Sequence, residues 1–112
     1  MRTAWLALAV WAGWEGANPS APVEIRTFQF RQASLEVPVG TEVVWSNRDA
    51  VEHTVTSGAP DSADGAFAGE LADSGAAFRH RFDRTGTYRY FCQRHHFMRG
   101  EIRVVPHTHG ES

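Results

Sequence analysis

The chain has 112 residues, 42% of them hydrophobic, which suits one globular domain built around a single core. Its formal net charge is −2, with 11 basic residues, all of them arginine, and 13 acidic residues. This charge balance argues against nucleic acid as a partner, because phosphate binding needs a basic surface. A single cysteine, Cys92, excludes an intramolecular disulfide framework, so another role such as metal ligation is needed to explain it.

The N-terminus is typical of an export signal. Arg2 precedes an apolar run over residues 3–13, which is too short for a membrane helix of about 20 apolar residues but suits the apolar part of a secretory signal, about 7–15 residues long. We therefore predict a signal peptide over residues 1–21, a periplasmic or otherwise exported location without stable membrane insertion, and a domain over residues 22–106. The alternative interpretation is a retained anchor or an N-terminal strand.

Beyond residue 21 the sequence predicts an all-β fold. Short stretches with alternating or β-branched residues, bounded by turn residues, predict strands at 24–30, 34–37, 42–46, 53–56, 78–82, 88–92 and 101–105. Residues 58–75, rich in Gly, Ala, Asp and Ser, predict a long loop with a helical turn near residues 67–71. The tail over residues 107–112 is polar and is expected to be flexible. Short strands at this spacing indicate a β-sandwich or a barrel.

The chemistry is concentrated in residues 92–98, Cys-Gln-Arg-His-His-Phe-Met. Cys92, His95 and Met98 recur every third residue, so one tight loop can turn a thiolate, an imidazole and a thioether toward one point. Two imidazoles and a thiolate, with a long axial thioether, define the blue-copper electron-transfer site. The candidate for the missing imidazole is His53. The sequence therefore predicts one type 1 copper ion bound by His53, Cys92, His95 and Met98.

The segments around these residues resemble the small blue-copper proteins, the cupredoxins. Residues 86–92, followed by His95, Met98, Gly100, Ile102 and Val104, resemble their C-terminal signature. Residues 45–49, followed by His53 and Val55, resemble the segment that carries their first histidine. The short spacings from Cys to His and from His to Met are those of amicyanin, whereas plastocyanin and pseudoazurin are similar but have longer loops. The resemblance covers residues 23–105.

This resemblance implies a Greek-key β-sandwich of about seven to eight strands. It implies a monomer that is not an enzyme and that shuttles single electrons between larger redox proteins, such as a c-type cytochrome or a dehydrogenase or reductase. It also implies that His53 is the buried ligand and that the edge of His95 is the electron port, with Phe97 and Pro60 in the surrounding apolar patch. The alternative function is a periplasmic copper carrier or chaperone with an exposed, exchangeable site.

Four positions depart from the resemblance. Arg94 and His96 stand where amicyanin-like loops usually carry proline, and Glu52 stands where proline is common before the first histidine. Thr54 replaces an asparagine that ties the two ligand loops together in many relatives, and a threonine hydroxyl is able to make a similar bond. These changes concern the rigidity and the redox potential of the site rather than the identity of its metal.

The remaining polar candidates have structural interpretations. His80 lies between two phenylalanines of an apolar strand face, so we expect a structural histidine rather than a ligand. Tyr88 follows the turn at residues 83–86, which favours a tyrosine corner over a redox relay. We expect His96 to point toward solvent. His107 and His109 belong to the polar tail, with adventitious surface metal binding as the alternative.

Overall fold

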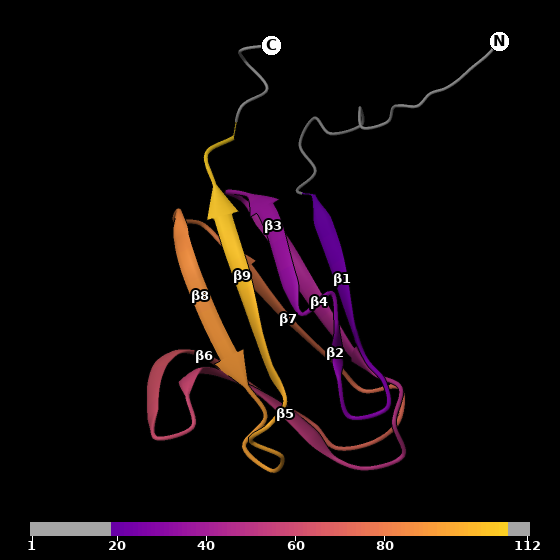
Figure 1. Cartoon of the computed structure of the whole chain (residues 1–112). Coiled ribbons are helices and arrows are strands. Elements are labelled where there is room, and N and C mark those ends of the chain that lie inside the picture. Colours follow the sequence, from indigo (N-terminus) through magenta and orange to yellow (C-terminus); the bar gives the residue numbers. More distant parts are fainter. Residues whose placement is uncertain (1–18, 108–112) are drawn as a thin grey trace, which may run out of the picture.

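The computed structural model describes residues 19–107, which form nine strands and no helix (Figure 1). The strands are β1 (Ser20–Ile25), β2 (Phe30–Arg31), β3 (Ser34–Pro38), β4 (Thr41–Asn47), β5 (His53–Ala59), β6 (Ser62–Leu71), β7 (Ala77–Phe82), β8 (Gly86–Phe91) and β9 (Arg99–Val105). Most of the predicted signal peptide and His109 lie outside the described residues. Within the described part of the chain, no helix is long and apolar enough to cross a membrane.

The strands form two sheets, ordered β2-β1-β4-β7 and β3-β9-β8-β5-β6. β1 runs parallel to β4, and β3 runs parallel to β9, whereas the other neighbours are antiparallel. Parallel neighbours need crossover connections, and here the chain passes from one sheet to the other between them. The predicted all-β Greek-key sandwich is confirmed, and five predicted strands lie within β3, β4, β5, β7 and β9.

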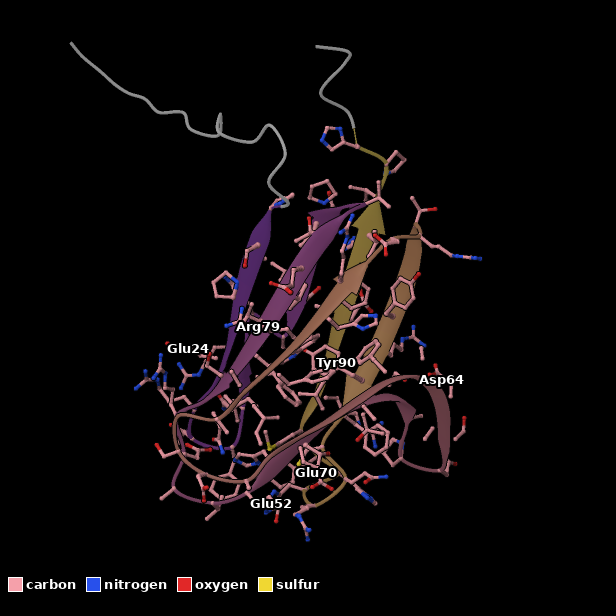
Figure 2. The ribbon with its side chains drawn as sticks, turned by 180° about the vertical axis from the view of Figure 1, so that it is seen from behind. Glu24, Glu52, Asp64, Glu70, Arg79 and Tyr90 are labelled. Carbon is pink, nitrogen blue, oxygen red and sulfur yellow. The ribbon has the colours of Figure 1, made fainter. Side chains whose placement is uncertain are left out.

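Alternating side chains of β4 build the centre of the core. Val43, Trp45 and the other odd-numbered residues of this strand are buried, while the residues between them are half-buried. The Trp45 ring lies 5.4 Å from that of Tyr90 and 5.5 Å from that of Phe78, so one large aromatic side chain joins both sheets. Figure 2 shows Tyr90 between the sheets. This core holds the strand ends that carry the candidate site.

The loop predicted over residues 58–75, with its helical turn, is wrong, because most of it forms β6. Phe67 and Leu71 are both buried, and a spacing of four residues fits one face of a helix as well as one face of a strand. Gly69 lies between them on the same face and has no side chain to reveal the alternation. A Cβ there would lie 2.2 Å from the Phe78 ring, so glycine is required for β6 to pack against β7.

The single strand predicted over residues 24–30 is also wrong. β1 ends at Ile25, and a tight turn then reverses the chain into β2, with Arg26 and Gln29 exchanging backbone hydrogen bonds of 3.0 and 3.1 Å. Thr27 and Phe28 have φ values of 56° and 58°, which is the left-handed region normally occupied by glycine or asparagine in such turns. Neither residue signals this turn in the sequence. β2 and β6 raise the number of strands above the expected seven to eight.

Two structural interpretations are confirmed. The Tyr88 hydroxyl donates a 2.8 Å hydrogen bond to the carbonyl oxygen of Arg84, which closes the tyrosine corner. His80 packs against the rings of Phe67 and Phe82, with centroids 4.9 and 4.7 Å away. Burial lowers the pKa of His80, although the charge of Asp83 acts in the opposite direction. Both residues therefore belong to the framework of the sandwich.

Candidate metal centre

Three of the predicted ligands meet at the end of the sandwich opposite the described chain ends (Figure 1). His53 begins β5, Cys92 follows the last residue of β8, and His95 lies on the loop between β8 and β9. Their ligand atoms all lie within 4.8 Å of one another. The Cys92 Sγ atom is 3.7 Å from Nδ1 of His53 and 3.8 Å from Nδ1 of His95. The structure therefore brings a thiol and two imidazole nitrogens to one point.

The loop before His53 is shaped by the buried side chain of Asn47. Its amide group donates to the carbonyl oxygens of Val51 and Leu71, at 2.9 and 3.2 Å, and its Oδ1 accepts the backbone N–H of Asp49 at 2.9 Å. These bonds satisfy a polar side chain that is otherwise enclosed by apolar residues. They fix the path by which the chain leaves β4 and delivers His53 to the site.

The loop after Cys92 closes on itself through its backbone. The Cys92 N–H donates to the Met98 carbonyl oxygen at 3.1 Å, and the Met98 N–H donates to the His95 carbonyl oxygen at 2.9 Å. These bonds place Met98, the fourth predicted ligand, beside Cys92. The Met98 side chain is buried in the same apolar cluster as Cys92. The backbone of the loop thus holds Cys92, His95 and Met98 close together.

Thr54 joins the two ligand loops, as expected from the sequence. Its hydroxyl oxygen accepts the Gln93 N–H at 2.8 Å, and its own backbone N–H lies 3.4 Å from the Cys92 Sγ atom. The first bond is the one expected of Thr54 from the resemblance, in which an asparagine at this position ties the two loops together. The second directs a donor at the sulfur, where hydrogen bonds stabilise the thiolate and tune a metal bound to it.

Arg94 and Glu52, two of the residues that stand where proline is expected, contact each other, which no sequence pattern indicates. Arg94 Nε lies 3.0 Å from the Glu52 carboxylate, so an ion pair joins the loop of His53 to the loop of His95. Both side chains are partly exposed, and such pairs contribute about 1 kcal/mol or less. Glu52 lies at the same end of the sandwich as the candidate site (Figure 2). A weak electrostatic contact therefore joins two positions at which the resemblance implies proline.

His95 and His96 have separate environments. His95 is half-buried and belongs to the ligand cluster. His96 is exposed, its ring lies edge-on to Phe91 at 5.9 Å, and its carbonyl oxygen accepts a bond from Arg99 at 3.0 Å. His96 also lines a groove of about 380 Å³ beside the loop, together with Pro60. The tight loop turns one imidazole inward and the next outward.

His53 is fully buried and has a carboxylate on its far side. Its Nε2 atom lies 2.9 Å from Oδ2 of Asp49, which leaves Nδ1 to face Cys92. Burial by itself would raise the pKa of the Asp49 carboxyl, but hydrogen bonds from the Phe28 amide, His53 and the Thr27 amide outweigh it and lower the pKa. Asp49 was not identified from the sequence as a partner of His53. The only signal for this contact in the sequence is that the two residues are four positions apart.

The donor set fits copper. A buried thiol and a buried thioether are soft sulfur ligands, and the two inward imidazole nitrogens suit both oxidation states of copper. Hard cations such as Mg²⁺ or Ca²⁺ prefer oxygen ligands, which this cluster does not supply from the described residues. The residues therefore provide the chemistry of a type 1 site.

Comparisons with known proteins agree with this chemistry. Residues 17–105 match the sequence model of the copper-binding proteins of the plastocyanin/azurin family. The chain is 34% identical over 90 residues to amicyanin from Paracoccus denitrificans, covering 80% of this chain and 69% of that protein. It is 30% identical over 90 residues to amicyanin-alpha from Methylorubrum extorquens, covering 80% of this chain and 76% of that protein.

Solved structures give the same result. A purple cupredoxin from Nitrosopumilus maritimus is similar with a TM-score of 0.70 and 29% identity, covering 76% of this chain and 99% of that one. The copper(I) form of an amicyanin variant gives a TM-score of 0.69 and 34% identity, covering 81% and 87% of the two chains. This chain therefore belongs to the plastocyanin/azurin family of copper-binding proteins, the blue-copper electron carriers with one type 1 copper ion.

Proposed function

We propose that this protein passes single electrons between larger redox proteins through one copper ion bound by His53, Cys92, His95 and Met98. The observation that supports this most directly is the approach of the Cys92 Sγ atom to both Nδ1 atoms, at 3.7 and 3.8 Å. Bound copper supplies a one-electron couple. The protein holds the ligands, excludes water from them and offers a route to the surface.

Rigidity is the main contribution of the chain to electron transfer. His53 and Cys92 are fully buried. Asp49 of the preceding loop holds the His53 ring, and the backbone N–H of Thr54 in β5 points at the Cys92 sulfur. Cuprous and cupric ions prefer different ligand arrangements. A protein that fixes its ligands in a compromise between the two arrangements accommodates both ions about equally. Little then has to move when an electron arrives or leaves.

The exposed edge of the site lies at His95. The rings of Phe28 and Phe97 lie 4.9 and 6.2 Å from its imidazole, and these two side chains are 36% and 70% exposed. An apolar surface around a half-buried imidazole allows a partner to displace water and approach the ligand. We propose this surface as the electron port, with a c-type cytochrome or a dehydrogenase or reductase as the partner.

The copper-loaded protein should be blue, should lose and regain its colour reversibly on reduction and oxidation, and should keep its copper during prolonged incubation with a chelator. A buried thiolate and a buried imidazole should release the ion slowly, which suits electron transfer and not delivery. An optical redox titration, followed by chelator challenge, measures this. Rapid and complete loss of copper to the chelator would instead support the copper carrier.

We also propose that the protein is exported to the periplasm. The supporting feature is the apolar run after Arg2. Ser20 and Ala21 pair with Glu42 and Val43 in the sheet, so cleavage just before Ser20 would leave β1 intact. N-terminal sequencing of native material should give a start between residues 18 and 22. A membrane-bound chain that retains residues 1–13 would contradict this proposal.

A further inference from the structure

One carboxylate connects the buried histidine to the turn between β1 and β2. Asp49 Oδ1 accepts the Thr27 N–H at 2.6 Å, and Oδ2 accepts the Phe28 N–H at 2.9 Å. Oδ2 also lies 2.9 Å from Nε2 of His53. The His53 side chain is 0% exposed and that of Asp49 is 12% exposed, so solvent screens the contact between Asp49 and His53 only weakly.

The contact with His53 determines which ring nitrogen carries hydrogen. An ionised carboxylate only accepts hydrogen bonds, so the nitrogen that contacts it must be the donor. In a neutral imidazole the other nitrogen then has a free lone pair, and here that nitrogen is Nδ1, 3.7 Å from the Cys92 Sγ atom. The same arrangement orients metal-binding histidines and raises their basicity in many metal sites. Asp49 thus selects the form of His53 that can ligate an ion.

The contact with the turn accounts for its left-handed backbone. Thr27 and Phe28 have φ values of 56° and 58°, a left-handed backbone that strains any residue other than glycine. Consecutive amides in such a turn form a concave site for an anion, and the Asp49 carboxylate occupies it. The Phe28 ring is thereby placed edge-on to His53 at 5.3 Å and to His95 at 4.9 Å.

Resting on the proposed function, we propose that Asp49 is a positioning residue for the copper site. It holds His53 as the tautomer with hydrogen on Nε2, strengthens its Nδ1 as a donor, and seats Phe28 against both histidines. A stronger imidazole donor favours the cupric over the cuprous state. Asp49 therefore holds the reduction potential below the value that the same ligands would give without it.

Asp49→Asn is the variant that tests this. One amide oxygen cannot replace both carboxylate oxygens, so at least one of the three donors loses its acceptor. Loss of such a partner typically weakens metal affinity by about 10–100-fold. If cupric affinity falls about tenfold more than cuprous affinity, the potential rises by about 59 mV. The variant should remain blue.

Glu70→Gln is the matched control. Glu70 lies opposite Thr54 in the β5–β6 pair and at the same end of the sandwich (Figure 2), and its replacement removes the same charge. The control should leave cupric affinity nearly unchanged and shift the potential less than Asp49→Asn does. Equal shifts in the two variants would show that Asp49 acts only through its charge and would overturn the proposal.

Nitrogen NMR of the metal-free protein provides a readout that does not depend on copper. The wild-type His53 ring should show hydrogen on Nε2 alone, and Asp49→Asn should show a mixture of the two tautomers. Phe28→Ala should keep the wild-type tautomer, because the Asp49–His53 bond remains. A mixed tautomer in the wild-type protein would overturn the proposal even if Asp49→Asn failed to fold. If the wild-type protein bound no copper in a blue form, the proposed function would fail instead.

Discussion

Cys92→Ser is expected to fold and to bind cupric ion without the intense blue absorption of the wild-type protein. The blue band arises from charge transfer from sulfur to copper, and serine offers only an oxygen. Cys92 is fully buried, and serine is close to it in size, so the sandwich should tolerate the change better than it would a larger residue. The measurement is the absorption spectrum of the copper-loaded variant, with circular dichroism to confirm the fold.

Met98→Leu is the contrasting variant for this experiment. It removes the other sulfur from the buried cluster but keeps an apolar side chain of similar volume. It should stay blue and show a raised reduction potential, because loss of a weak axial donor disfavours the cupric state. A blue Cys92→Ser protein would refute the assignment of the thiolate. A lowered potential in Met98→Leu would refute the axial role of Met98.

His95→Ala and His96→Ala are expected to give opposite results. His95 offers Nδ1 at 3.8 Å from the Cys92 Sγ atom, so its removal should abolish the blue signal unless external imidazole is supplied. His96 is exposed and packs against Phe91, so its removal should leave the colour and the copper affinity almost unchanged. Absorption and electron paramagnetic resonance of the two copper-loaded variants measure this difference.

Because His95 and His96 are adjacent, a flexible loop would be able to exchange one imidazole for the other at the metal. Proline is absent on both sides of His95, and the Arg94–Glu52 ion pair, at 3.0 Å, is an exposed contact of small energy. The Met98 N–H donates to the His95 carbonyl oxygen at 2.9 Å, which also constrains the backbone of the loop at His95. Two blue variants would mean that the loop exchanges one histidine for the other, and reversed results would make His96 the ligand.

Contacts between the two ligand loops help to hold this site together. Thr54 accepts the Gln93 N–H at 2.8 Å, and Arg94 contacts Glu52 at 3.0 Å, so two bonds cross between the loops that carry the histidines. Proline would restrict each loop separately by limiting its backbone. Here the restriction depends on both loops being in place, which ties the geometry of the site to the folded sandwich.

Features that depend on local chemistry and on short sequence periods could be predicted from the amino-acid sequence alone. Cys92, His95 and Met98 are close in the chain, so their spacing already predicted a common centre. Alternation at residues 78–82 predicted β7, because each side chain there reports directly on which face it occupies. His53 was found through its resemblance to a known segment, although it lies 39 residues from Cys92.

Features that depend on contacts between distant segments could not be predicted in this way and became clear only in the folded chain. The turn at Thr27 and Phe28 follows from Asp49, 21 to 22 residues away, which supplies the carboxylate that holds a left-handed backbone no local residue favours. β6 exists because β5 offers it a partner and because the missing side chain of Gly69 admits the Phe78 ring. In each case the decisive energy lies in a contact between segments, and no pattern within either segment records it.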